Sequence, residues 1–349
     1  MTRKTDGVTV KPLFRPLTLF ALLALAAALA SAPAWAQLAP GSIDVHWNEG
    51  SADCAKNPQP PLQEHQYNAR TFILRENLCT TFEAPFMYLL IGSTKALLID
   101  TGDIEDSKVV PLAETVMHLL PGDGPSKLPL LVVHTHRHLD HRAGDEQFAH
   151  LSNAQVVGFD IDSVRSHYKF TDWPNALAEI DLGDRTVDAI PTTGHNETEV
   201  TFYDRSTGLL FTGDFLMPAR LLIDDTGADV ASADRIAAFV KDRPISFVLG
   251  GHIEMNSAGE LFPWESQYHP HEHVLQLTKD DVLALPETIR SFNGFYRVHG
   301  KFTMENSMRI LIAFGIGALA IAAAIVWFLV RCIARRRRAR KARSKSPPQ

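Results

Sequence analysis

Short apolar runs bounded by turn residues recur through the middle of this chain, and such runs predict strands. Residues 128–135 (LPLLVVHT) contain a continuous apolar run, which is typical of a strand buried on both faces. Other strands are expected within residues 88–91, 96–99, 154–159, 185–195, 198–214 and 245–252. Helices are expected between them, at residues 109–120, 160–169 and 234–242. This order predicts an α/β (or α+β) fold in which strands pack as sheets with helices outside.

The N-terminal end contains a longer apolar run than the predicted strands do. Residues 17–30 (LTLFALLALAAALA) follow a basic region and precede SAPAWAQ, in which Ala34 and Ala36 form a small-x-small site. This order predicts a secretory signal peptide over residues 1–36, so that the mature chain begins near Gln37. An uncleaved anchor is the alternative, although the apolar run is shorter than the roughly 20 residues of a membrane span.

The C-terminal end carries a second apolar segment. Residues 310–330 contain no charged side chain, and at about 1.5 Å per residue they extend about 31 Å, the thickness of a bilayer core. A strongly basic segment, residues 331–349, follows directly. We therefore expect a transmembrane helix with a cytoplasmic tail. A buried core helix and a nucleic-acid-binding tail are the alternatives.

Together the two ends predict a cell-membrane protein with a single span. Its body would be exported to the periplasm or the extracellular space. Residues 37–84, which begin as a polar, proline-rich stretch, are expected to form an N-terminal arm, and residues 85–305 the folded domain. Cys54 and Cys79 lie in the exported part, where a disulfide can persist, so we expect them to pair. Two free thiols are the alternative.

Charge is distributed unevenly between the body and the ends. The chain has 34 basic and 40 acidic side chains, of which four basic and one acidic lie in residues 1–36 and nine basic in residues 331–349. Residues 37–330 therefore hold 21 basic and 39 acidic side chains, a net charge of −18. Because so acidic a body repels polyanions, nucleic acid is a poor candidate for the substrate, and we expect a small-molecule substrate and no nucleic-acid partner.

The segment VVHTHRHLDHRAGD, residues 132–145, concentrates metal-binding side chains just after a predicted strand. Other predicted strands also end at polar residues, namely His195, Asp214 and His252. Side chains at strand ends and in the loops that follow can converge on one rim of a sheet. Imidazole and carboxylate ligands suit zinc, and seven candidates are too many for one ion with about four ligands. The candidate ligands are His136, His138, Asp140, His141, His195, Asp214 and His252.

The segment HRHLDH, residues 136–141, resembles the HxHxDH motif of the metallo-β-lactamase superfamily. Other elements of that family follow in the expected order over residues 85–260: LLIDTG at 97–102, PTTGH ending at His195, LFTGD ending at Asp214 and LGGH ending at His252. The resemblance implies a four-layer αβ/βα sandwich with two Zn²⁺ ions at one edge. Iron or manganese are alternative metals.

The resemblance also implies a role for each ligand. One metal would be held by His136, His138 and His195, and the other by Asp140, His141 and His252. Asp214 would bridge the two metals. Asp140 would in addition be catalytic, because its second oxygen can orient the attacking water. Asp100 and Asp103 are candidates for supporting the ligand histidines from behind, with solvated turn residues as the alternative.

The implied activity is hydrolysis of an ester, lactone, thioester or amide bond by a metal-activated hydroxide. An aspartate at position 214 is typical of glyoxalase II-like, lactonase-like and other esterase-type members, whereas many β-lactamases of the family carry cysteine or serine there. The alternatives are β-lactamase activity proper and a mononuclear iron dioxygenase of the same fold. His269, His271 and His273, which follow the last ligand, are interpreted as surface loop residues; an accessory metal site or the substrate mouth is the alternative.

Overall fold

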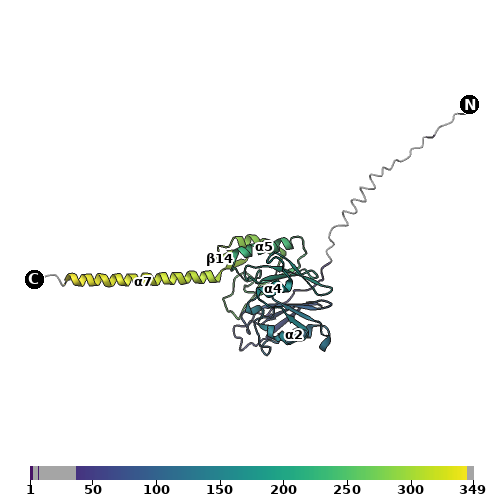
Figure 1. The fold of residues 1–349 in the computed structure, drawn as a ribbon, viewed down its shortest axis with the longest axis horizontal. Helices are drawn as coiled ribbons and strands as arrows, with labels where there is room; N and C mark the ends of the chain where they lie inside the picture. Colours follow the sequence, from purple (N-terminus) through teal and green to yellow (C-terminus); the bar gives the residue numbers. More distant parts are fainter. Residues whose placement is uncertain (3–6, 8–36, 344–349) are drawn as a thin grey trace. The chain divides into compact units, whose positions relative to one another are not determined.

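The computed structural model describes residues 1–2, 7 and 37–343 (Figure 1). The predicted signal peptide therefore lies outside the described residues, apart from three positions at its start. The last six residues of the predicted tail, 344–349, also lie outside them. The expectation of export consequently stays a prediction.

Strands form three sheets within the described residues. The first sheet has the order β1 (Leu62–Asn68), β2 (Thr71–Glu76), β3 (Phe86–Ile91), β4 (Ala96–Ile99), β5 (Leu130–Val133) and β6 (Ala154–Val156). The second has the order β13 (Gln276–Leu277), β12 (Phe247–Gly250), β10 (Leu209–Gly213), β9 (Val200–Asp204), β8 (Thr186–Pro191) and β7 (Ala178–Asp181). A small third sheet joins β11 (Arg220–Leu222), β15 (Phe302–Glu305) and β14 (Tyr296–His299).

Six α-helices are described: α2 (Leu112–Leu119), α3 (Glu146–Ala149), α4 (Ile161–Tyr168), α5 (Thr226–Val240), α6 (Lys279–Arg290) and α7 (Ser307–Arg343). Their starts have local causes. The Asp160 carboxylate accepts hydrogen bonds from the backbone at the start of α4, and Asp225 does the same for α5. Thr278 and Asp281 form a reciprocal capping box at α6.

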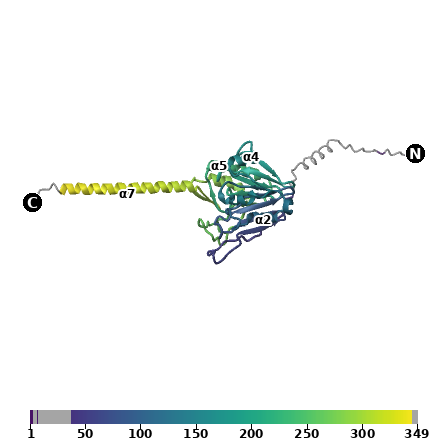
Figure 2. The same cartoon turned by 60° about the horizontal axis from the view of Figure 1, so that its bottom comes forward.

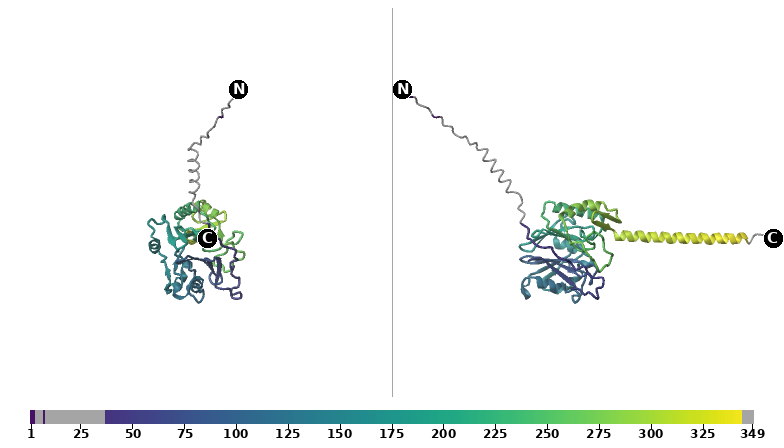
Figure 3. Two further views of the ribbon diagram at one scale, coloured as in Figure 1. Left: turned by 90° about the vertical axis from the view of Figure 1, so that its right-hand side faces the viewer. Right: turned by 180° about the vertical axis from the view of Figure 1, so that it is seen from behind.

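Three hydrophobic cores separate four layers. Because alternate side chains of a strand point to opposite faces, Ile73 of β2 packs between the two large sheets while Leu74 packs outward. The outward core of the first sheet includes Val116 of α2, and that of the second sheet includes Ile236 of α5 and residues of α6. Figure 1 accordingly shows α2 and α5 on opposite sides of the paired sheets, and Figures 2 and 3 show the same layers from other directions. The fold is thus a mixed α/β sandwich of the layered kind expected.

The N-terminal segment 37–84 is not an arm throughout. Its second half supplies β1 and β2, which pair with each other and, through β2, with β3. All six residues of β2 are buried, so this strand belongs to the core rather than to an appendage. The first half, before β1, is irregular and is tied to the loop after β2 by the disulfide between Cys54 and Cys79.

Helix α7 contains the second apolar segment of the sequence. Within it, residues Ser307–Arg338 form the one helix among the described residues that is long and apolar enough to cross a membrane. Its apolar side chains are exposed, which argues against the alternative of a buried core helix. The direction in which it would cross a membrane stays a prediction.

Glu76, the last residue of β2, is an acid held in the interior. Burial raises the pKa of its carboxyl to about 8, and only one of its oxygens accepts a hydrogen bond, from the backbone of Asp103. In the unfolded chain this group ionises near pH 4.5. Between these two values the unfolded chain has lost a proton that the folded protein keeps, so the free energy of unfolding falls as pH rises.

The neutral variant Glu76→Gln is therefore expected to be more stable than the wild type at pH 8 and nearly unchanged at pH 4, below the pKa of the unfolded chain. Between the two pKa values the gain grows by about 1.4 kcal/mol for each pH unit. Urea unfolding at both pH values measures it, with Glu64→Gln on the exposed side of β1 as control. An equal change at both pH values would contradict the assigned protonation.

Candidate metal centre

The candidate ligands lie where strands end. His136, His138, Asp140 and His141 follow β5, while Asp214 and His252 follow β10 and β12. β4 and β5 are parallel, as are β10 and β12, so the carboxyl ends of each pair lie at the same edge of their sheet. His195 is supplied by the loop after β8. All seven side chains come together where these edges of the two sheets meet, and they form two groups.

The first group consists of three imidazoles. The Nε2 atom of His136 lies 2.9 Å from Nδ1 of His138, and Nε2 of His195 lies 3.1 Å from the same Nδ1. The three rings are nearly perpendicular to one another. Three nitrogen atoms thus face one point, which is the arrangement of a three-histidine metal site.

The second group consists of two imidazoles and two carboxylates. The Oδ2 atom of Asp140 lies 3.2 Å from Nε2 of both His141 and His252. The Oδ1 atom of Asp214 lies 3.4 Å and 3.5 Å from the same two nitrogens. His141, His252 and Asp214 are buried, while Asp140 is partly exposed, so the group lies in the interior with one carboxylate open to solvent.

Asp214 lies between the two groups. Its Oδ2 atom is 3.7 Å from Nε2 of His195 in the first group, while Oδ1 faces the second group. Oδ1 is also buried without a hydrogen-bond partner among the described residues. A buried carboxylate oxygen is costly unless it is hydrogen-bonded or coordinates a cation. The donor set and this unsatisfied oxygen therefore fit a pair of divalent cations that share Asp214.

The protein holds the ligand rings from behind. Nδ1–H of His141 donates to Asp100 (2.9 Å), Nδ1–H of His195 to the Leu222 carbonyl (2.9 Å), and Nδ1–H of His252 to the Glu83 carbonyl (2.7 Å). Each of these bonds fixes the tautomer and leaves Nε2 free to face the centre. The sequence could suggest Asp100, but backbone carbonyls such as those of Leu222 and Glu83 leave no signal in residue identity.

Asp100 supports the centre and Asp103 does not. Besides His141, Asp100 accepts hydrogen bonds from the backbone and hydroxyl of Thr135. Asp103 instead accepts a hydrogen bond from Thr81 and contacts none of the ligands in a hydrogen bond. The two candidates that the sequence left equal are thereby distinguished.

Charges within the centre shift the pKa values of its members in opposite directions. Burial lowers the pKa of His136, and the neighbouring imidazoles add to that effect. Burial acts the same way on His252, but Asp214 and Asp140 outweigh it and raise the pKa of His252 to about 10. The same carboxylates, with Asp100, raise the pKa of His141 well above its usual value. Conversely, although burial opposes it, these histidines hold the pKa of Asp140 and Asp214 well below the usual range.

Replacing Asp100 by asparagine is expected to weaken divalent-metal binding by about 10–100-fold, because His141 loses the acceptor that fixes its ring. Competition with a chelator of known affinity measures the change. Asp103→Asn is the matched control, since it makes the same substitution nearby without touching a ligand. Equal affinities for Asp100→Asn and the wild type would rule out the supporting role.

The three histidines after the last ligand do not form a set. His269 is buried, stacks on Phe262 with 4.1 Å between ring centroids, and bonds to Glu272, which in turn pairs with the buried Arg75. It is therefore a packed residue, and its interpretation as a surface loop residue was wrong. His271 is exposed, as expected. None of the three belongs to a metal-binding group among the described residues.

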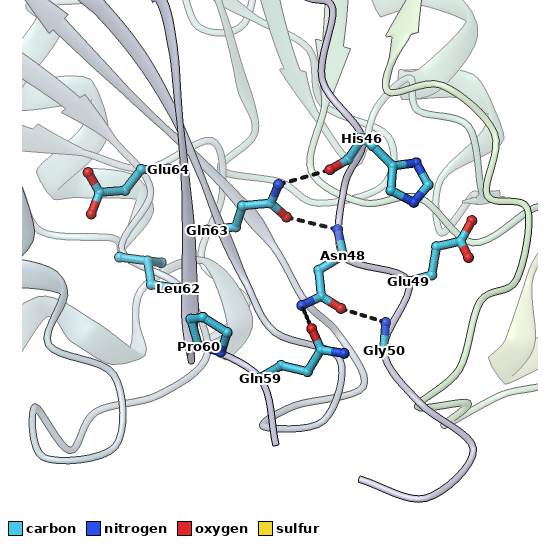
Figure 4. Close-up of a pocket in the computed structure, with 9 residues that line it drawn as sticks. All are labelled: His46, Asn48, Glu49, Gly50, Gln59, Pro60, Leu62, Gln63 and Glu64. Atoms are coloured by element: carbon cyan, nitrogen blue, oxygen red, sulfur yellow. Dashed lines mark hydrogen bonds between the residues drawn. The ribbon is translucent and has the colours of Figure 1, made fainter. Parts of the chain in front are cut away.

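A separate cavity of about 550 Å³ lies beside the N-terminal segment, away from the candidate ligands. Figure 4 shows its lining, in which Gln63 contacts the backbone of His46 and of Asn48. Its side chains are mostly amides and carboxylates, of which Asn48 donates to Gln59, and none of the seven candidate ligands lines it. None of its residues belongs to a metal-binding group among the described residues.

Comparison with known proteins gives one family match. The model described as "Metallo-beta-lactamase superfamily" matches residues 80–252, the stretch that contains all seven candidate ligands. Among solved structures, a metallo-beta-lactamase from Pontibacter korlensis aligns with a TM-score of 0.44 and 16% identity, covering 65% of this chain and 99% of that one. One from Hirschia baltica aligns with a TM-score of 0.41 and 14% identity, over 55% and 90% of the two chains.

Curated relatives are named as an acyl-coenzyme A thioesterase and as hydroxyacylglutathione hydrolases. The acyl-coenzyme A thioesterase MBLAC2 of Gallus gallus is 24% identical over 229 residues, which are 56% of this chain and 82% of the relative. A hydroxyacylglutathione hydrolase of Methylobacillus flagellatus is 28% identical over 58% of this chain and 75% of its own length. One of Rhodobacter capsulatus is 36% identical over 47% and 66%.

Proposed function

Since the chain belongs to the metallo-beta-lactamase superfamily and is a metallo-hydrolase of that fold, we propose that it hydrolyses a thioester of a small molecule with the help of two divalent cations, zinc in the first place. The observation that carries the proposal is the shared position of Asp214. Its two oxygens face two complete ligand groups, so the site suits a pair of ions rather than one.

The two groups of side chains would each hold one cation. His136, His138 and His195 would hold one cation, and Asp140, His141 and His252 the other, with Asp214 between them. A bound pair of divalent cations supplies a water that is acidic near neutral pH and a Lewis acid for the carbonyl oxygen. Around that pair the chain provides fixed ligand rings, a largely buried setting and a carboxylate able to accept a hydrogen bond from that water.

Asp140 is that carboxylate. Its Oδ2 atom is directed at His141 and His252, while its Oδ1 atom has no hydrogen bond among the described residues. Its pKa is held well below the usual range, so it is ionised at neutral pH. Oδ1 is therefore available to accept a hydrogen bond from the attacking water and to orient it toward the thioester carbonyl.

Two observations favour a thioester over other bonds. Two curated relatives that are matched over most of their own length are named as an acyl-coenzyme A thioesterase and a hydroxyacylglutathione hydrolase, and both names denote enzymes that cleave thioesters. The residue shared between the two groups is an aspartate, as the esterase-type members of the family are expected to have, and not a cysteine or serine. Fold alone does not decide the substrate, so the identity of the acyl group and of the thiol is left to experiment.

We further propose that α7 anchors the enzyme in a membrane. The helix is long and apolar enough to span one, and basic residues follow the apolar segment from Arg331 onward. With residues 331–349 on the cytoplasmic side, the hydrolase would act outside the cytoplasm. Protease protection of a C-terminal tag in intact cells, with the body accessible, tests this orientation; the reverse pattern would refute it.

The activity is tested on the full chain in detergent. Acyl-CoA and S-acylglutathione thioesters, an aryl ester, a lactone and a chromogenic β-lactam are offered as substrates, and the metal content of the same sample is measured. We expect thioester turnover with two metal ions per chain. Turnover of the β-lactam alone, or one iron per chain with oxygen uptake, would replace the proposal with one of the two alternatives raised by the sequence.

A further inference from the structure

We propose that the strand β14, together with the turn before it, rests in the headgroup region of the membrane that α7 enters, and so seats the hydrolase against the lipid surface. The inference rests on the proposed span of α7. It goes beyond the anchor, because it assigns a membrane contact to a second, non-helical part of the body. The occupant of this surface is the lipid bilayer.

The first observation is an apolar surface on an edge strand. β14 is the outer strand of the third sheet, next to β15. Phe295, Tyr296 and Val298 are 49%, 49% and 55% exposed, whereas β15 beside them is entirely buried. Edge strands of water-facing sheets are normally protected by charged or polar side chains, since an exposed apolar edge invites aggregation. Exposed aromatics here therefore require a covering environment.

The second observation fixes this surface to the start of α7. The backbone N–H of Asn306, the residue before the helix, donates to the carbonyl of Phe295 at 2.9 Å. The side chain of Asn306 accepts a hydrogen bond from the backbone of Arg309, and the Arg309 guanidinium reaches the Gly294 carbonyl at 3.4 Å. The turn before β14 is thus held at the level of the first helical turn.

The third observation is an open apolar groove at this junction. Phe295 and one side of α7, including Ile310, Phe314 and Ile321, line a shallow space of about 460 Å³. Two small residues of the helix, Gly317 and Ala318, deepen it. Its walls carry no charged or polar side chain. A space of this kind suits the upper part of a lipid acyl chain.

The length of the apolar segment of α7 determines how deep the start of the helix, and with it β14, lies in the membrane. Residues 310–330 extend about 31 Å, which matches the hydrocarbon core with little room to slide. Ile310 then lies at the boundary of the core, and Phe295, which faces it, lies at the same level. Aromatic side chains such as Phe295 and Tyr296 are favoured at this boundary. Arg297, exposed on the other face of β14, is within the zone of lipid phosphates.

The test measures contact with lipid at single positions of the full chain. Cys332, the one free cysteine, is first replaced by serine, since Cys54 and Cys79 form a disulfide. Single cysteines are then introduced as Tyr296→Cys or Val298→Cys and labelled with an environment-sensitive fluorophore. Leu177→Cys, about equally exposed on the body, is the matched control, and Ala322→Cys within α7 is the positive control. Each variant is reconstituted in vesicles with and without a mixture of lipids brominated near the head and near the end of the acyl chain, so that labels at the boundary and at the centre of the bilayer are both quenched.

We expect about a two-fold drop of fluorescence in brominated vesicles for labels at 296 and 298 and for the label at 322, and no drop for the label at 177. Labels at 296 and 298 that behave like the one at 177 while 322 is quenched would overturn the proposal and leave the span intact. Labels at 296 and 298 that are shielded from a water-soluble quencher but insensitive to brominated lipid would also overturn it, in favour of a protein partner or a second copy. An unquenched label at 322 would refute the span on which the proposal rests. Thioester hydrolysis is measured separately in detergent, so its absence would bear on the proposed function alone.

Discussion

Replacing Asp140 by asparagine is expected to lower kcat/KM for thioester hydrolysis by about 10²–10⁴-fold, the range found when a general acid or base is removed. The amide keeps the size of the side chain and one oxygen that can face His141 and His252. It removes the negative charge and replaces the second oxygen by an NH₂ group, which cannot accept a hydrogen bond from water. The loss therefore reports on hydrogen-bond acceptance and charge rather than on packing.

Asp103→Asn is the control for this variant. It makes the same substitution in a neighbouring part-buried aspartate that has no hydrogen bond to a ligand, so its activity is expected to stay within about two-fold of the wild type. Thermal unfolding and metal content are measured on both proteins. A chain with asparagine at 140 that keeps full activity with its metals in place would show that Asp140 has no catalytic part.

The positions of the metal-binding side chains were accessible to sequence reasoning because each has a local cause. Four of the seven lie in one six-residue segment, 136–141, directly after an apolar strand. His195, Asp214 and His252 stand at the ends of other apolar runs, and sheet edges bring such ends together. Periodicity and strand ends therefore predicted the convergence, and the structure supplied what they cannot, namely which oxygen or nitrogen of each side chain faces which neighbour.

Elements without a clear apolar pattern were the ones missed. Helix α6 contains Pro286, which disfavours a helix interior, and its start depends on the capping box of Thr278 and Asp281. Helix α5 was expected only over residues 234–242, yet it begins at Thr226, because small residues pack against the second sheet there without forming an apolar stripe. His269 was placed on the surface because neither its stacking on Phe262 nor its pairing with Glu272 has a sequence signature.

Replacing Asp214 by alanine is expected to reduce the metal content from about two ions per chain to about one or fewer, and to lower thioester hydrolysis accordingly. Each oxygen of Asp214 faces one of the two groups: Oδ1 faces His141 and His252, and Oδ2 faces His195. Without this carboxylate no negative charge lies between the two groups. Two cations bound close together in a buried site would then repel each other strongly, which disfavours binding of the second ion. Elemental analysis of the purified variant gives the stoichiometry.

The number of protons released on metal binding independently tests the role of Asp214. In the metal-free wild type His141 and His252 carry protons at pH 7, since nearby carboxylates raise their pKa values. Cation binding must displace about two protons. Calorimetric titration in buffers of different ionisation enthalpy is expected to show that release in the wild type and less of it in Asp214→Ala, because Asp214 is the strongest of the charges that keep His252 protonated.

Asp224→Ala is the control for both measurements, since Asp224 is exposed and its side chain makes no hydrogen bond within the described part of the chain. It should bind two ions and release the same number of protons as the wild type. Two ions per chain in Asp214→Ala, with unchanged proton release, would mean that the two groups are independent sites. The proposed division of the seven ligands around a shared aspartate would then have to be abandoned.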